Sequence, residues 1–206
     1  MSQTANINQH DLYAADYDDQ VLSYDCHMAE ILFGLCYEYV MPDQLLLDVG
    51  IGTGISAQLF ARAGLQVYGM DFSTAMLEIC QAKGFAIELK QQDILQTPWP
   101  YPDNRFNHLV CCGVLHFASN LEVVLSEAQR VLWDDGMFAF TTRTVPFRNT
   151  YQLKYVLMNR DGMVIYSHTR DYLESLLSAH SFKRIKIQKC FVGDDIFTLW
   201  VVQKHP

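Results

Sequence analysis

Short apolar runs alternate with amphipathic segments along most of the chain, as in proteins whose strands alternate with helices. The first run, Leu45–Gly50, reads as a strand that is buried on both faces. The pattern predicts strands over the ranges Leu45–Gly50, Leu65–Phe72, Phe85–Gln91, Phe106–Cys112, Met137–Thr142, Lys183–Cys190 and Ile196–Gln203.

The amphipathic segments between these runs carry helix signals. The clearest stripe, from Leu121 to Leu132, repeats at three- and four-residue spacing along one face. Ser73 and Thr169 are of the residue types that cap a helix start, and Gly64 and Gly84 suit helix ends. The pattern predicts helices over Met28–Tyr39, Ser56–Ala63, Ser73–Lys83, Leu121–Leu132 and Thr169–His180.

This alternation predicts an α/β fold, in which a doubly wound, mostly parallel sheet of seven strands is covered by helices on both faces. The last two strands are joined by only four residues, Val192 to Asp195. They must therefore run antiparallel, because a parallel return needs a crossover of about a dozen residues. The stretch TPWPYPDN, residues 97–104, holds three prolines in five residues and is expected to be irregular surface.

Length and composition predict one domain over residues 1–206, with a helical cap over 1–42 and a core over 43–206. The net charge of −8 argues against a nucleic-acid partner, since binding to phosphates relies on clustered Lys and Arg. The amino terminus does not read as a secretory signal, and no apolar run approaches the length of a membrane span. The six cysteines form no C-x-x-C pair and indicate reduced thiols in a cytoplasmic protein.

The stretch LLLDVGIGTG, residues 45–54, places glycines at 50, 52 and 54, after an acid at Asp48. In a doubly wound sheet, ligands bind beyond the carboxyl ends of the strands, where such a loop lies. The dinucleotide motif G-x-G-x-x-G would need a glycine at position 55, which is Ile55. A P-loop is excluded because no G-K-[ST] follows.

The loop resembles the first motif of class I S-adenosylmethionine-dependent methyltransferases. The resemblance continues in register through VYGMDFS, QQDI, FNHLVCCGVLHF and EAQRVLWDDGMFAFTT, from about residue 43 to 143. The start, YAADYDDQVLSYD, is similar to that of the small methyltransferases of the Williams–Beuren-region type and their bacterial relatives. The resemblance implies the Rossmann-like methyltransferase fold, with S-adenosyl-L-methionine as cofactor.

The resemblance also implies roles for individual residues. Asp48 and the backbone of Gly50, Gly52 and Gly54 would surround the methionine part of the cofactor. Asp71 would accept hydrogen bonds from both ribose hydroxyls, for which a carboxylate offers two oxygens. The other implied cofactor contacts are Phe72 and Met76 beside the adenine, Asp93 and Ile94 at its edge, and Cys112 and Gly113 beneath the sulfonium.

The sequence indicates the residues that would bind the methyl acceptor less clearly than those for the cofactor, and the catalytic residue is unknown. His116 is the best candidate for a general base, although packing or a cofactor contact is the more frequent role there. Tyr13, Tyr17 and Tyr24 belong to the segment that relatives fold over the cofactor, and would either orient the substrate or stabilise a lid. Arg143 could bind a substrate carboxylate, but a structural role is favoured.

Several features narrow the chemistry. Asp194 and Asp195 favour a cationic substrate only weakly and are better explained as solvated turn acids. The motif [ND]-P-P-[YF] of enzymes that methylate base amines or glutamine amides is replaced by Cys111 to Val114. A metal is not expected, because these cysteines also stand where metal-dependent relatives place a carboxylate.

The expected function is methyl transfer to a small molecule, because only the amino-terminal residues and segment 143–169 are left to cover a substrate. The acceptor atom and the oligomeric state stay open. A non-catalytic module that binds the cofactor or its demethylated product is the alternative hypothesis. A nicotinamide-dependent oxidoreductase is a third, which the glycine spacing disfavours.

Overall fold

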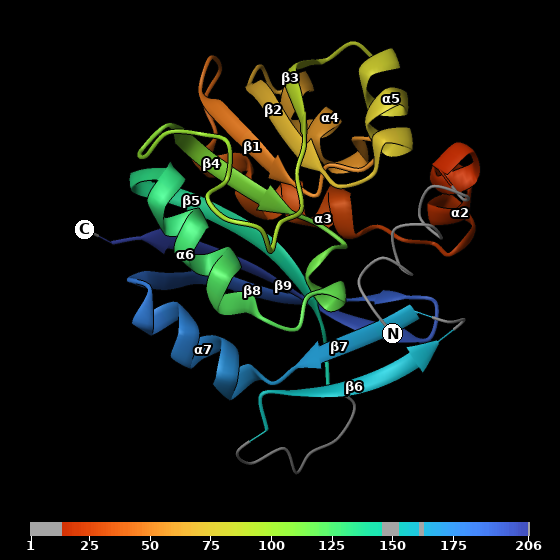
Figure 1. Cartoon of the computed structure of the whole chain (residues 1–206), viewed down its shortest axis with the longest axis vertical. Helices are drawn as coiled ribbons and strands as arrows, with labels where there is room; N and C mark the ends of the chain where they lie inside the picture. The colour runs from red at the N-terminus through yellow and green to blue at the C-terminus, as the bar shows by residue number, and fades with distance from the viewer. Residues whose placement is uncertain (1–13, 146–152, 161–162, 206) are drawn as a thin grey trace.

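The computed structural model describes residues 14–145, 153–160 and 163–205. Its main sheet runs in the order β3-β2-β1-β4-β5-β9-β8, with five strands parallel to one another and β9 antiparallel to both β5 and β8 (Figure 1). The predicted fold class is confirmed. The strands are β1 (Leu45–Val49), β2 (Gln66–Asp71), β3 (Ala86–Gln91), β4 (Phe106–Cys111), β5 (Leu132–Arg143), β8 (Phe182–Val192) and β9 (Asp195–Lys204).

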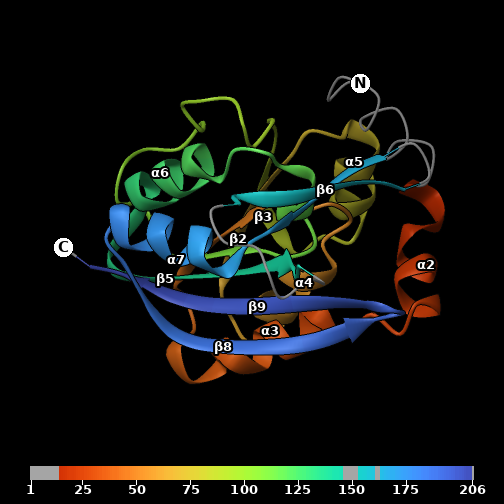
Figure 2. The ribbon, with the colours of Figure 1, turned by 90° about the horizontal axis from the view of Figure 1, so that it is seen from below.

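Helices cover both faces of this sheet, as the apolar pattern predicts. The helices contribute to two separate hydrophobic clusters. One cluster contains residues of α3 (Met28–Cys36), α4 (Ile55–Arg62) and α5 (Thr74–Ala82), and the other contains residues of α6 (Leu121–Val131) and α7 (Arg170–Ala179). Figure 2 shows β8 and β9 between α3 and α7. The predicted caps are confirmed, since Ser73 Oγ accepts from the Met76 amide and Thr169 Oγ1 from the Tyr172 amide.

The chain also forms a small hairpin that the sequence did not predict, β6 (Tyr155–Arg160) with β7 (Met163–His168). It packs against the end of β5 and the short 3₁₀ helix η3 (Leu115–Phe117), away from the main sheet (Figure 1). Tyr155 and Tyr166 pair across it with ring centroids 4.9 Å apart. The hairpin therefore occupies part of the segment expected to cover a substrate.

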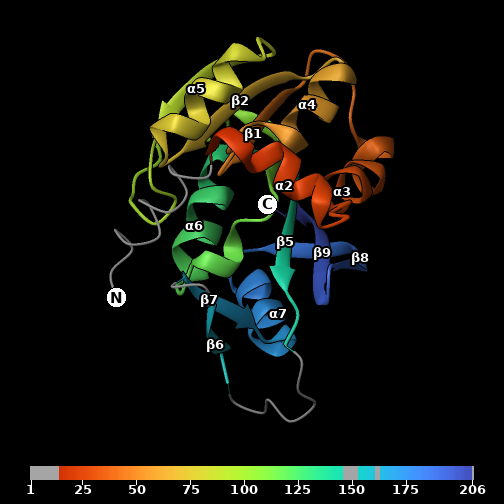
Figure 3. The ribbon, with the colours of Figure 1, turned by 90° about the vertical axis from the view of Figure 1, so that its right-hand side faces the viewer.

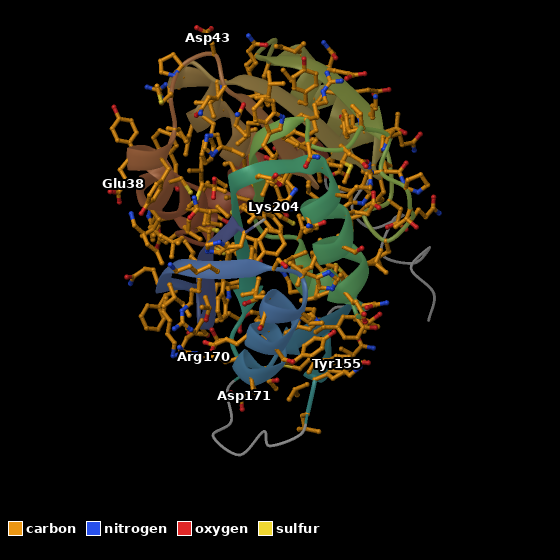
Figure 4. All side chains as sticks on the ribbon, turned by 90° about the vertical axis from the view of Figure 1, so that its left-hand side faces the viewer. Glu38, Asp43, Tyr155, Arg170, Asp171 and Lys204 are labelled. Carbon is orange, nitrogen blue, oxygen red and sulfur yellow. The ribbon has the colours of Figure 1, made fainter. Side chains whose placement is uncertain are left out.

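The start of β5 lies at the opposite edge of the sheet from the ends of the parallel strands. Residues 134–136 lie within the strand, with Asp135 at a φ of 63°. The buried Lys204 ammonium binds the Leu132 carbonyl and the Asn104 side chain, both at 2.8 Å (Figure 4).

In the described part of the chain, no helix is long and apolar enough to cross a membrane.

The proline-rich stretch 97–104 is irregular as predicted, but the expectation that it lies at the surface is wrong for its aromatic residues. Trp99 and Tyr101 are buried, with exposed fractions of 1% and 4%. Glu127 on α6 accepts the Trp99 amide proton at 2.6 Å, and Arg130 donates to the Trp99 and Tyr101 carbonyls. These side chains replace the hydrogen bonds that a proline-interrupted backbone cannot make internally.

We expect Glu127→Ala to destabilise the protein by about 3 kcal/mol, because it leaves Arg130 and the Trp99 amide without their buried acceptor. Burial by itself raises the pKa of the Glu127 carboxyl, but hydrogen bonds from Arg130 and Trp99 outweigh it and lower the pKa. Urea unfolding at pH 7 measures the loss. Glu122→Ala, an exposed position on the same helix, is the control, and equal effects of the two variants would contradict the assignment.

Candidate functional site

A cavity opens beyond the carboxyl ends of β1, β2 and β4, where the sequence predicted a ligand. Its floor is the glycine loop after β1, and its walls come from the segments after β2, β3 and β4. Helix α2 (Tyr17–Ser23) and the start of α3 complete it. Figure 3 views this edge and shows α2 lying across it between α5 and α3.

The glycine loop has a backbone that only glycine adopts without strain. Gly50, Gly52 and Gly54 have φ values of 79°, 54° and 89°. A Cβ at Gly50 would lie 2.6 Å from a methyl of Val114, whereas a Cβ at Gly52 would have no atom within 4 Å. Gly52 therefore faces open space in the cavity, so the main chain there can approach a ligand closely.

Asp71, at the end of β2, connects this loop to the next segment. One carboxylate oxygen accepts the Gly52 amide proton at 2.8 Å and the other accepts the Ser73 amide proton at 2.9 Å. The side chain lines the cavity and is 7% exposed. Each carboxylate oxygen has more than one acceptor position, so Asp71 can still receive hydroxyl protons from a ligand.

Asp48 lies beneath the loop and is fully buried, and it is not among the described residues that line the cavity. Its Oδ2 accepts a hydrogen bond from Ser56 at 2.9 Å, and its Oδ1 has no partner in the described structure. Burial, with a smaller contribution from the Asp71 charge, raises the pKa of Asp48 to about 7, against the opposite effect of Ser56. Ser56, which lines the cavity, stands between Asp48 and any ligand.

The other residues that the resemblance assigned to the cofactor are brought together here. Gly113 has a φ of 75° and donates its amide proton to Thr141 Oγ1 at 2.8 Å. The cavity is lined by all of these predicted residues: Phe72, Met76, Asp93, Ile94, Cys112 and Gly113.

Sequence reasoning missed part of the lining. Thr53 and Ser56 could have been suggested by their position in and after the glycine loop. No sequence signal marks the residues that arrive from the amino-terminal helices and from the segment after β4: Val21, Cys26, Met28, Ala29, Phe117 and Ala118.

The tyrosines named for the acceptor have different positions. Tyr17 lines the cavity, and burial, with the nearby Cys112 and Cys26 thiols, raises the pKa of its phenol. Tyr24 is 62% exposed at the end of α2 and does not line the cavity, and Tyr13 lies outside the described residues. Tyr17 is therefore the predicted tyrosine that the described structure brings to the cavity.

His116 and Arg143 are not among the described residues that line the cavity. The His116 ring packs 4.0 Å from Phe117 and 5.4 Å from Phe197, between centroids. Arg143 is 7% exposed, forms an ion pair with Asp195, and donates to Ser167 Oγ at 3.2 Å. Arg143 thus joins β5 and β9 to the β6–β7 hairpin, which agrees with the structural alternative. The expectation that Asp195 is merely a solvated turn acid is wrong.

Among the described residues, no group of three His, Cys, Asp or Glu side chains is placed to hold a metal ion. Among the described residues that line the cavity, carboxylates come from Asp71 and Asp93 alone. Helix α2 and the start of α3 form a lid on the cavity, and their described lining residues are uncharged: Tyr17, Val21, Cys26, Met28 and Ala29.

Comparison with known proteins agrees with this geometry. Residues 47–140 match the family model described as a methyltransferase domain. A demethylmenaquinone methyltransferase of Tropheryma whipplei is 35% identical over 124 residues, covering 57% of this chain and 52% of that protein. Methyltransferase-like protein 27 of Homo sapiens is 32% identical over 154 residues, covering 72% of this chain and 60% of that protein. The chain thus spans little more than half the length of these relatives.

The fold also resembles that of a methyltransferase of known structure. A Burkholderia thailandensis 1,6-didemethyltoxoflavin-N1-methyltransferase, solved with its substrate and S-adenosylhomocysteine, superimposes with a TM-score of 0.74 at 16% identity, covering 99% of this chain and 90% of that one. Residues 47–140 thus match a methyltransferase domain, and the chain has the fold of class I methyltransferases.

The raised pKa of Asp48 predicts a pH-dependent stability. The folded protein holds this proton more tightly than the unfolded chain does, so the Asp48 contribution to stability falls as pH rises from about 4 to 7. We expect Asp48→Asn, which removes the titrating group, to become more stable relative to wild type as the pH rises over this range. The gain is at most about 4 kcal/mol, at 1.36 kcal/mol per pKa unit.

Urea unfolding of both proteins at pH 5 and pH 8 measures the effect. The Asn variant keeps an acceptor for Ser56, so the two proteins differ mainly in the ionisation of residue 48. The difference in their unfolding free energies at pH 8, minus the same difference at pH 5, therefore measures this ionisation. Parallel pH profiles of the two proteins would show that Asp48 titrates normally.

Proposed function

We propose that the protein transfers a methyl group from S-adenosyl-L-methionine to a small, largely apolar acceptor. The observation that carries the proposal is the paired geometry of Gly52 and Asp71. The Gly52 backbone faces open cavity, and a carboxylate 2.8 Å from its amide lines the same space. A ligand that carries a diol could donate hydrogen bonds to Asp71 while a neighbouring part of the ligand packs closely against the Gly52 backbone.

The chain's residues fit the parts of this cofactor. Asp71 would accept the ribose hydroxyl protons, and Phe72 and Met76 would pack beside the adenine, with Asp93 and Ile94 at its edge. The loop glycines would surround the methionine part, with Asp48 supporting them from behind Ser56. Cys112 and Gly113 would lie beneath the sulfonium.

S-adenosylmethionine, when bound, supplies an electrophilic methyl group on a positively charged sulfur. The task left to the chain is to hold an acceptor in line with that methyl, and positioning of this kind can lower a barrier by about 7–11 kcal/mol. Tyr17 is suited to orient the acceptor, because it lines the cavity and its phenol can donate a hydrogen bond. His116 packs beside Phe117 and Phe197, so a role as general base loses support.

The small-molecule acceptor is supported by the uncharged lid residues and by relatives that include a demethylmenaquinone methyltransferase. The narrower resemblance to the Williams–Beuren-region type stays a prediction, as do the single-domain organisation and the cytoplasmic location.

Calorimetric titration with S-adenosylmethionine, S-adenosylhomocysteine and NAD separates the three hypotheses. We expect micromolar binding of the first two ligands and none of NAD. Formation of S-adenosylhomocysteine in the presence of a panel of hydroxyarenes, amines and thiols would then distinguish an enzyme from a binding module. Binding of NAD alone would overturn the proposal.

Asp71→Ala should weaken binding of S-adenosylhomocysteine by about 2–3 kcal/mol, the worth of hydrogen bonds to a charged acceptor. The measurement is calorimetric, with Glu78→Ala, an exposed acid on α5, as the control that also removes one negative charge. Unchanged affinity of the Asp71 variant would remove the ribose assignment.

Gly52→Val should abolish cofactor binding that is measurable by calorimetry, because the valine side chain would fill the space in front of the loop. Gly193→Val is a matched control, since Gly193 has a φ of 53° against 54° for Gly52 and also faces open space. The two variants carry similar backbone strain. If both bound the cofactor equally well, the loop would not contact it.

A further inference from the structure

Asp18, on helix α2, joins the lid to the glycine loop and to the end of α5. Its Oδ1 accepts a hydrogen bond from Thr53 Oγ1 at 2.5 Å, and its Oδ2 accepts one from the Lys83 ammonium at 2.5 Å. Thr53 belongs to the glycine loop, and Lys83 follows directly after α5. One carboxylate thus bridges three segments that are far apart in the sequence.

The Thr53 contact distinguishes this bridge from an ordinary surface ion pair. Thr53, which lies between Gly52 and Gly54 in the loop, is 1% exposed and lines the cavity. Asp71 holds the same loop from its other side, through the Gly52 amide. The loop is therefore fixed between a carboxylate of the sheet and a carboxylate of the lid.

The position of Asp18 also determines what lies over the cavity. Its neighbour Tyr17 and, one helical turn on, Val21 line the cavity from α2. The described α2 residues make few other hydrogen bonds to the body of the protein, and none of the helix's residues is fully buried. Helix α2 lies across the edge where the cavity opens, so a ligand seated on the glycine loop is covered by it (Figure 3).

We propose that Asp18 is a positioning residue that latches α2 over the cofactor site, so that cofactor release requires both of its hydrogen bonds to break. The proposal rests on the proposed function for the identity of the ligand. The latch holds Tyr17 in the lining of the cavity, and it opens when α2 leaves Thr53 and Lys83 together. Both bonds are charge-assisted, while the carboxylate is partly exposed, so the latch can open without unfolding the core.

The test compares Asp18→Ala, which removes the acceptors of both hydrogen bonds, with wild type in the full-length protein. We expect the dissociation rate of S-adenosylhomocysteine, measured by surface plasmon resonance, to rise about tenfold, which corresponds to about 1.4 kcal/mol. Lys83→Met should give a smaller rise, because it leaves the Thr53 bond in place. Asp19→Ala is the matched control, since Asp19 is an exposed acid on the same helix.

A second measurement needs no ligand. Hydrogen exchange of the α2 amides in the free protein should be faster in Asp18→Ala than in Asp19→Ala, while exchange in β1 and β4 stays the same. The midpoint of thermal unfolding should change little, because α2 contributes no fully buried residue. A dissociation rate and an α2 exchange that both equal those of the control would overturn the latch.

The two proposals fail in different ways. If wild-type protein bound neither S-adenosylmethionine nor its demethylated product, the proposed function would be wrong, and exchange of α2 would still decide whether Asp18 holds the helix. If wild type bound the cofactor while Asp18→Ala released it no faster, the latch would be wrong and the methyltransferase proposal would stand.

Discussion

The left-handed backbone after β1 is the constraint on which the rest of this site depends. Positive φ angles at Gly50, Gly52 and Gly54 turn the chain out of the sheet and directly into α4. A side chain at Gly50 would collide with Val114, so the turn and the segment after β4 can approach only if that position is glycine. Because β1 lies at the middle of the sheet, the same turn brings the ends of its neighbours β2 and β4 to one cavity.

Electrostatics at this edge divide the cavity into two parts. Asp71 makes its hydrogen bonds to backbone amides and faces the cavity, whereas Asp48 is buried behind Ser56 and its pKa is raised. The two acids thus lie in different environments, Asp48 behind the cavity and Asp71 in its lining. The described lining residues from α2 and the start of α3 carry no charge, so the charged side chains of the lining come from the sheet side of the cavity.

The segments outside the sheet have a common role in shaping that second part. Helix α2 crosses the edge of the sheet, and the β6–β7 hairpin packs on η3, which leads from β4 to α6. Arg143 holds the hairpin to the sheet through Asp195 and Ser167. The overall fold is shared with distant relatives at 16% identity.

The sequence by itself determined the seven-stranded sheet, most helix ends and much of the lining of the cavity. Those features depend on local patterns: alternating apolar runs, caps such as Ser73, and glycines whose backbone conformation is a property of the residue. The tertiary structure alone decided the burial of Trp99, the hairpin at Tyr155–His168, the pairing of Arg143 with Asp195 and the contact of Asp18 with Thr53. Each of these depends on a partner distant in the chain or on packing that no local pattern records.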